Sequence, residues 1–249
     1  MKKKTTLFIS LLIIIGIAVY SLVDFNEYEF SEYDIELVDY FNEVALNAEY
    51  DVSPNRITKW TKPMKLFIIK EKELSYEVSL IKNTIEKINN LVKDEFYIQL
   101  IDDPKKCNAI IFLMEKERLE PLMPDLFENI EYDINGLADI GFDLETFHIL
   151  DARIFIDILQ PKESIETTIL EEITQSIGLM NDSEKYPDSV FYENKLDSII
   201  TVDYSKMDIE IIKMLYHPKM KPGLNYDKAE KVIKKILKGK KTFYNTVYN

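Results

Sequence analysis

The segment that most constrains the fold is an amphipathic run over residues 163–179, which predicts a long helix. Gly178 stands at its end, and glycine is the residue best able to take the left-handed backbone that terminates a helix. Side chains four apart share one helix face, and a terminating glycine lets the chain turn a later side chain back towards that face. The polar residues placed in this way are Glu171, Glu172, Gln175, Asn181 and Asp182. We therefore expect a cluster of oxygen-bearing side chains at the end of this helix.

The rest of the chain alternates between strand and helix patterns. Apolar residues at helical spacing predict helices over residues 31–50, 76–92, 205–216 and a last one that ends near 237. Short apolar runs predict strands at 64–69, 96–101 and 108–113, and a strand pair at 147–150 and 152–158. Strands and helices in this order predict an α+β fold with a twisted mixed sheet and two long helices.

An uncharged run from Thr5 to Val23 predicts a membrane span. At about 1.5 Å per residue it reaches about 28 Å, close to the hydrocarbon thickness of a bilayer. Lysines at 2–4 precede the run and acidic residues follow it, which orients the remainder of the chain outwards. A cleaved signal peptide, with residues 16–18 as its small-residue site, is the alternative. Either interpretation places the domain on the extracytoplasmic side, and we expect residues 5–23 to anchor a single-pass membrane protein.

Composition excludes several classes of function. The net charge of −13 argues against nucleic-acid binding, which requires a basic surface. None of the six glycines forms a dinucleotide-binding or phosphate-binding motif, so no cofactor is expected. The single cysteine, Cys107, allows no disulfide within the chain and no lipid attachment at a signal-sequence cysteine.

The polar helix end resembles the zinc motif of the metzincin metalloproteases, H-E-x-x-H-x-x-G-x-x-H or D. In that motif imidazoles bind zinc and the glutamate is the general base. The resemblance places Glu172 at the position of the base and three oxygen-bearing residues at those of the ligands, Glu171, Gln175 and Asn181. Residues 188–192 resemble the methionine turn of matrixin-type enzymes, with Phe191 in place of the methionine.

The chain also resembles a bacterial family of lipoproteins and membrane-anchored proteins of unknown activity. Its members carry Glu-x-x-Gln-x-x-Gly-Leu-x-Asn-Asp, Asp-Ser-x-Phe and Leu-Tyr-x-Pro-x-x-x-Pro-Gly, which here are residues 172–182, 188–191 and 215–223. The resemblance covers most of residues 33–237. The apolar run and the acidic residues after it predict a membrane anchor or signal segment at 1–24 and an acidic lead-in with an amphipathic helix at 25–52. The resemblance implies a metzincin-like domain with a helical C-terminal subdomain at 53–240.

Amide side chains are poor zinc ligands, so the loss of the imidazoles predicts no zinc and no other bound metal. We expect a non-catalytic module that binds a peptide or an envelope component in a cleft. The expected lining residues are Glu171, Gln175, Gly178, Asn181, Asp182, Ser189, Phe191 and Tyr192. A hydrolase of glycans or peptides is the alternative, with Glu172 as the catalytic residue beside a second carboxylate or an oxygen-ligated metal.

Overall fold

The computed structural model describes residues 29–48, 54–71, 73–128, 130, 134–193 and 200–247. The chain divides into two units, residues 1–32 and residues 33–249, and nearly all described residues belong to the second. The predicted membrane run at 5–23 lies outside the described residues. Within the described ranges, no helix combines the length and the apolar character needed to span a bilayer.

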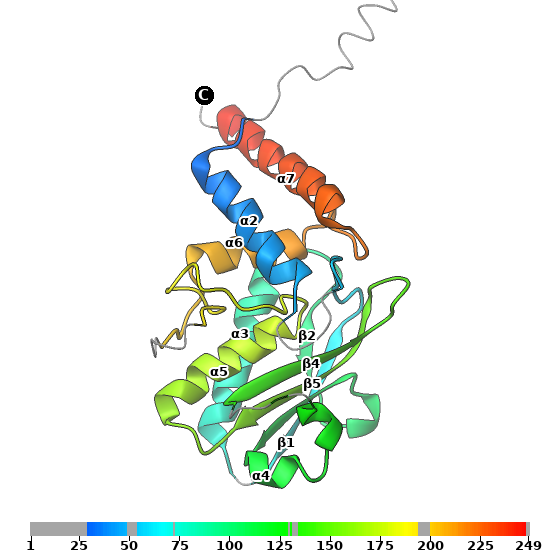
Figure 1. Cartoon of the computed structure of the whole chain (residues 1–249), viewed down its shortest axis with the longest axis vertical. Coiled ribbons are helices and arrows are strands. Elements are labelled where there is room, and N and C mark those ends of the chain that lie inside the picture. Colours follow the sequence, from blue (N-terminus) through cyan, green and yellow to red (C-terminus); the bar gives the residue numbers. More distant parts are fainter. Residues whose placement is uncertain are drawn as a thin grey trace, which may run out of the picture. The chain divides into compact units, whose positions relative to one another are not determined.

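A mixed sheet forms the centre of the second unit (Figure 1). The described strands are β1 (Met64–Lys70), β2 (Ile98–Leu100), β3 (Ala109–Met114), β4 (Gly136–Phe142) and β5 (Ile149–Asp157). Their order across the sheet is β2-β1-β3-β5-β4. Neighbouring strands are parallel except β4, which runs antiparallel to β5. Because a central parallel strand is covered on both faces, β3 is a nearly continuous apolar run.

Two helices, α3 (Ser75–Leu91) and α5 (Lys162–Gln175), pack on each other and cover one face of the sheet. Gly136 of β4 lies against α5, where a Cβ at this glycine would come within 2.4 Å of Thr168 Cγ2. Ile156 lies opposite Gly136 and shares its face. The fully buried side chains of this layer include Ile111, Leu113, Ile154 and Ile156. The predicted pair of long helices against a mixed sheet is therefore confirmed.

The other face of the sheet is covered by the connection between β3 and β4, which carries α4 (Lys116–Leu119) and a 3₁₀ turn at Pro124–Phe127. These elements close a second apolar cluster made of Phe112, Met114, Leu119, Leu126, Phe127, Ile134, Leu137 and Phe155. Within it the rings of Phe127 and Phe155 meet edge to face with centroids 5.2 Å apart.

Three further helices, α2 (Glu32–Leu46), α6 (Lys206–Leu215) and α7 (Tyr226–Val247), are joined by polar contacts. Lys240 of α7 forms an ion pair with Glu210 of α6 at 2.5 Å. The ammonium of Lys206 in α6 lies 4.4 Å from the centroid of the Tyr33 ring in α2. A helical C-terminal part follows the sheet, as the sequence predicts.

The predicted strand pair at 147–150 and 152–158 is wrong. Residues 149–157 form the single strand β5, whose antiparallel partner is β4, a strand that the sequence does not predict. Asp151 is exposed in the middle of β5. Because aspartate is common in turns, the sequence pattern predicts a turn at this position. β4 contains two glycines and an aspartate, which have low strand propensity, so its conformation is set by pairing with β5.

Three helix ends also differ from prediction. The helix predicted over 31–50 is α2, which ends at Leu46. α5 ends at Gln175 and continues as a turn over 176–178. The last helix extends to Val247, beyond the predicted end near 237. Gly239 lies inside it and does not terminate it, because glycine in a helix costs only about 1 kcal/mol relative to alanine.

Candidate functional site

The end of α5 is held by side chains from distant parts of the chain. The Trp60 indole Nε1 donates to the carbonyl of Ser176 at 2.9 Å, and the Tyr216 hydroxyl donates to that of Ile177 at 2.8 Å. These carbonyls have no partner within the helix itself, so the two donors replace the missing hydrogen bonds. Trp60 and Tyr216 are 1% and 0% exposed. The position of the predicted site is therefore fixed by buried aromatic residues.

Gly178 takes the role that the sequence predicts. Its φ of +109° lies in the left-handed region, which a residue with a Cβ rarely adopts. A Cβ at this position would lie 2.1 Å from the carbonyl oxygen of Thr58. The glycine is therefore required both by the turn and by the close approach of another backbone segment.

The structure brings Gln175 and Asp182 together. Gln175 Nε2 donates to Asp182 Oδ1 at 2.7 Å, and Gln175 is only 5% exposed. The Asn181 amide Nδ2 donates to the backbone carbonyl of Asp182 at 2.6 Å, and its backbone N–H donates to Val44 of α2 at 3.3 Å. Gln175 and Asn181 are two of the three residues that stand at the positions of the metzincin zinc ligands. The side-chain amides of both therefore form hydrogen bonds within the protein.

The two glutamates of α5 differ in their surroundings. Glu172 is 7% exposed, and a Cβ at Gly136 would lie 2.6 Å from its Oε1, so this side chain is packed between α5 and β4. Glu171 is half-buried. Gly136 makes room for the Glu172 side chain, because any larger residue in β4 would collide with it.

These residues do not fit a zinc ion. Zinc in proteins is bound by imidazole, thiolate or carboxylate, and two of the three candidate ligands are amides. The amide of Gln175 is held by Asp182 rather than directed with Glu171 and Asn181 towards a common point. Among the described residues, no group of three or more His, Cys, Asp or Glu side chains is arranged to hold a metal ion.

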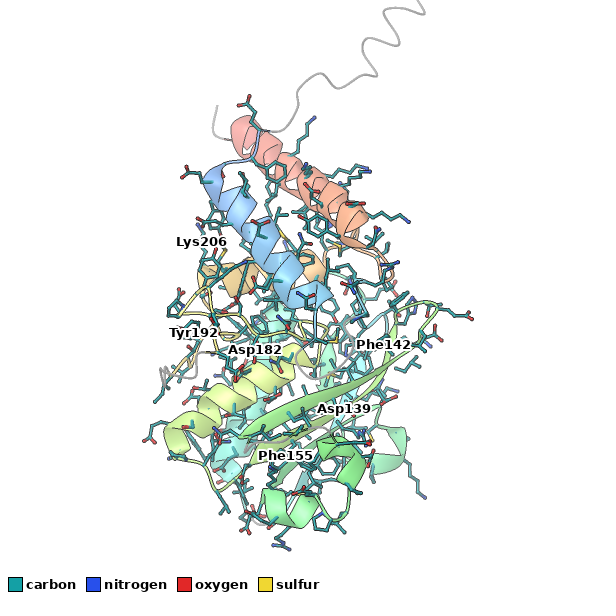
Figure 2. All side chains as sticks on the ribbon, viewed as in Figure 1. Asp139, Phe142, Phe155, Asp182, Tyr192 and Lys206 are labelled. Atoms are coloured by element: carbon teal, nitrogen blue, oxygen red, sulfur yellow. The ribbon has the colours of Figure 1, made fainter. Side chains whose placement is uncertain are left out.

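The loop after α5 is tied to α2 and α6 through Ser189. Its hydroxyl donates to Asp208 Oδ1 at 2.6 Å and accepts hydrogen bonds from Tyr40 Oη at 2.5 Å and from the Phe191 backbone at 3.0 Å. Tyr40 is the donor because the Ser189 proton is already used. Ser189 and Phe191 are 2% and 0% exposed, so the structure places them in the core. Figure 2 shows Asp182 and half-buried Tyr192 of the same loop near α5.

Asp208 is the centre of this network, although the sequence does not single it out as a site residue. Its carboxylate also accepts from the backbone N–H groups of Val190 at 3.1 Å and Ser205 at 2.8 Å, the latter as part of a capping box that starts α6. Burial raises the pKa of Asp208 above its ordinary value, and the hydrogen bonds oppose this only in part. Burial likewise raises the pKa of Tyr40. The Ser-x-x-Asp pattern at 205–208 is the signal that predicts such a cap.

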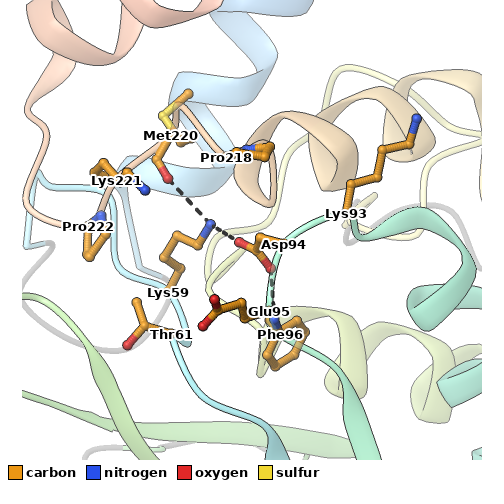
Figure 3. A pocket seen from close by; sticks show the side chains of 10 residues that line it. All are labelled: Lys59, Thr61, Lys93, Asp94, Glu95, Phe96, Pro218, Met220, Lys221 and Pro222. Carbon is orange, nitrogen blue, oxygen red and sulfur yellow. Dashed lines mark hydrogen bonds and ion pairs between the residues drawn. The ribbon is translucent and has the colours of Figure 1, made fainter.

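A buried lysine forms a second polar centre (Figure 3). Lys59 Nζ donates to Asp94 Oδ2 and to the Leu215 carbonyl, both at 2.8 Å, and lies 4.4 Å from the centroid of the Tyr216 ring. Burial lowers the pKa of Lys59, and the Asp94 carboxylate opposes this. A cavity of about 590 Å³ adjoins the pair, lined by Phe96, Pro218 and Pro222 among others. No local sequence pattern indicates this contact, because Lys59 and Leu215 are 156 residues apart.

Replacing Lys59 with methionine is expected to lower the free energy of unfolding by about 2–3 kcal/mol. The change leaves the Asp94 carboxylate and the Leu215 carbonyl without their donor, and the cost is moderated because the Asp94 side chain is 20% exposed. Urea denaturation measures the effect. Lys70→Met is the control, since Lys70 pairs with Glu73, whose side chain is 91% exposed, and should change stability by less than about 0.5 kcal/mol. Equal effects of the two substitutions would show that the buried pair has no special role.

The fold and the site together define a mixed α/β domain with a hydrogen-bonded polar cluster at the end of α5. The chain belongs to the family described as "Protein of unknown function (DUF2927)", which matches residues 34–235.

A comparison with curated proteins found no match. Among solved structures, the chain is distantly similar to one reported as the crystal structure of myroilysin, with a TM-score of 0.43 and 9% identity over 76% of this chain and 97% of that one. A second structure of myroilysin gives a TM-score of 0.40 and 8% identity over 64% of this chain and 96% of that one.

Proposed function

We propose that this chain is a membrane-tethered, extracytoplasmic, metzincin-like domain that binds an extended peptide along the outer edge of β4 without cleaving it. The mixed sheet, the two helices on one face and the helix that ends at Gly178 support the metzincin-like assignment. The apolar run at 5–23 supports the tether. Of the predicted cleft residues, the half-buried ones, Glu171, Asn181, Asp182 and Tyr192, stay part of the proposal, whereas buried Ser189 and Phe191 do not.

The observation that carries the proposal is the position of β4. It is an edge strand, and among the described residues only β5 pairs with it. Residues 138–142 are all half-buried, so no described element covers them completely. Ile140 lies on the face that packs against α5, two residues from Ala138 and four from Gly136. A strand edge with N–H and C=O groups available can pair with an extended peptide, and a neighbouring apolar side chain gives it a place to pack.

The absence of catalysis is proposed from how the polar groups are used. Gln175 and Asn181 are engaged in hydrogen bonds, Ser189 is enclosed in the Asp208 network, and Glu172 is packed against Gly136. A general base has to reach the proton that it removes, within about 2.6–3.2 Å. An enclosed Glu172 side chain is poorly placed for a base that acts on a peptide along β4.

Introducing a charge on the β4 edge should weaken peptide binding. Ile140→Lys is expected to weaken binding by at least about tenfold, because a lysine at an edge opposes strand pairing and removes an apolar contact. Gln99→Lys, which places the same residue on the opposite edge strand β2, is the control and should bind normally. Fluorescence anisotropy with labelled hexapeptides of alternating apolar and polar residues measures the affinities.

Two kinds of result, one from binding and one from cleavage, would contradict the proposal. One is an equal loss of affinity in both lysine variants, or no binding of any peptide by the wild type. The other is cleavage of the labelled peptides, with or without added zinc, that disappears in Glu172→Gln. The second result would establish the hydrolase alternative instead.

A further inference from the structure

Gly141 leaves a gap in the edge strand β4. It lies opposite Asp151 of β5, so the two residues share one face of the sheet. A Cβ built on Gly141 would lie 2.6 Å from Asp151 Oδ1 and 2.7 Å from Oδ2. The Asp151 carboxylate therefore occupies the space in which a side chain of residue 141 would stand, and it extends from the second strand towards the open edge.

The charge of Asp151 is not compensated within the part of the chain that the structure describes. Asp151 is exposed, and no described side chain forms an ion pair or a hydrogen bond with its carboxylate. Arg153, two residues further along β5, pairs with Asp139 of β4 and with Asp125, each at 2.5 Å. This guanidinium is used by other carboxylates, so the face that carries Gly141 keeps a net negative charge near the edge.

The opposite face of β4 is apolar at the same place. Neighbouring residues of a strand point to opposite faces, so Ile140 lies on the face that packs against α5 and Gly141 lies on the other. A peptide that pairs with β4 places consecutive residues opposite these two positions. One of its side chains then lies beside Ile140, and the next lies above Gly141, beside the Asp151 carboxylate.

We infer that the β4 edge selects a peptide in which a lysine or arginine stands next to an apolar residue, and that Asp151 determines this specificity. The specificity rests on the proposed binding of an extended peptide to β4. Residues directly opposite each other on neighbouring strands have Cβ atoms about 4.5–5.5 Å apart, so a basic side chain opposite Gly141 reaches the carboxylate. Opposite charges in such a pair favour strand pairing, and like charges oppose it.

The test is fluorescence anisotropy with the full-length chain in a nonionic detergent at low ionic strength. Three labelled hexapeptides share one alternating apolar and polar sequence and differ only at a central polar position, which is Lys, Gln or Glu. Wild type should bind the Lys peptide about 2–5-fold more tightly than the Gln peptide, and the Glu peptide more weakly by a similar factor. The ratio of affinities for the Lys and Glu peptides is therefore expected to be about 5–20-fold.

Three variants locate the selection. Asp151→Asn should reduce the Lys-to-Glu ratio to about twofold or less. Gly141→Val keeps the net charge but fills the space of the carboxylate and displaces it, so the ratio should fall below about threefold. Asp102→Asn is the control, because Asp102 is exposed and lies two residues after β2, at the opposite edge of the sheet. It removes the same charge as Asp151→Asn and should keep the wild-type ratio.

The ratio compares two peptides on the same variant, so a change in the folded fraction does not alter it. Equal affinities of wild type for the three peptides, or an equal fall of the ratio in Asp102→Asn and Asp151→Asn, would overturn the selection by Asp151. If Ile140→Lys still weakened binding of the Gln peptide, the β4 site itself would stand. If Ile140→Lys had no effect, or if no peptide bound, the proposed site and its specificity would both be wrong.

Discussion

Gly178→Ala is expected to lower the free energy of unfolding by about 2–6 kcal/mol, a large part of the stability of a domain of this size. Alanine at a φ of +109° costs about 1–3 kcal/mol in backbone strain. Its Cβ would also meet the Thr58 carbonyl at 2.1 Å, and relief of that contact requires the backbone to move, at about 1–3 kcal/mol or more. Guanidinium denaturation followed by circular dichroism measures the change.

A glycine-to-alanine substitution inside α7 should have the opposite effect on the free energy of unfolding. Gly239 lies inside α7, and a Cβ there would meet nothing within 4 Å. Gly239→Ala should therefore stabilise the protein by about 0.5–1 kcal/mol, because alanine has less backbone freedom to lose on folding. If Gly178→Ala did not destabilise the protein, this result would contradict the left-handed turn after α5 and its close contact with Thr58.

Asp208→Asn should destabilise the protein by about 3–4 kcal/mol. The substitution keeps the shape of the side chain but replaces one carboxylate oxygen with an amide nitrogen. That nitrogen would face either the Ser189 hydroxyl, which bonds to Oδ1, or the Val190 and Ser205 backbone N–H groups, which bond to Oδ2. Losing one hydrogen bond to a charged acceptor costs about 1.5–3 kcal/mol, and the buried donor left unpaired adds a further cost of about 1 kcal/mol or more. Thermal and urea unfolding at neutral pH measure the difference from wild type.

The pH dependence of this difference has a defined sign. The pKa of Asp208 is raised above its ordinary 3.8, so folding favours the protonated form of this group. Its contribution to stability is complete below pH 3.8 and is lost as the pH rises through the folded-state pKa. The advantage of wild type over Asp208→Asn should therefore be larger at pH 4 than at pH 7.

Asp203 supplies a control whose contribution to stability has the opposite pH dependence. A hydrogen bond from Lys87 lowers the pKa of Asp203 below 3.8, so its contribution is present above pH 3.8 and is lost as the pH falls through the lowered value. The advantage of wild type over Asp203→Asn should shrink as the pH falls from 4 to 2. Parallel pH profiles for the two variants would show that the Asp208 carboxylate is not buried as described.

The features that the sequence predicts are those encoded locally. The helical spacing of α3 and α5, the strand pattern of β1 and β3, and the turn at Gly178 each depend on residues close together in the chain. β4 is different, because Gly136, Asp139 and Gly141 form a strand only when β5 pairs with them. Pairing between strands is a tertiary contact, and a pattern with low strand propensity does not reveal it.

The candidate site was predictable as a position and not as a set of contacts. Gln175 and Asp182 are seven residues apart and meet across the turn, in agreement with the expected gathering of polar groups. The sequence predicts Ser189 and Phe191 in a cleft, but both are buried in the core. Exposure is decided by tertiary packing, which a local pattern does not show. Lys59 reaches Leu215 across 156 residues, and no local pattern records a contact of that length.

The aromatic donors at the end of α5 make early and late parts of the chain depend on each other during folding. Trp60 and Tyr216 reach the same turn over sequence separations of 116 and 39 residues. The turn therefore cannot be completed before residue 216 is in place, and a shortened chain that ends earlier loses more than its last helices. Such long-range closure is entropically costly and slows folding, and it makes the sheet, the long helices and the C-terminal helices a single cooperative unit.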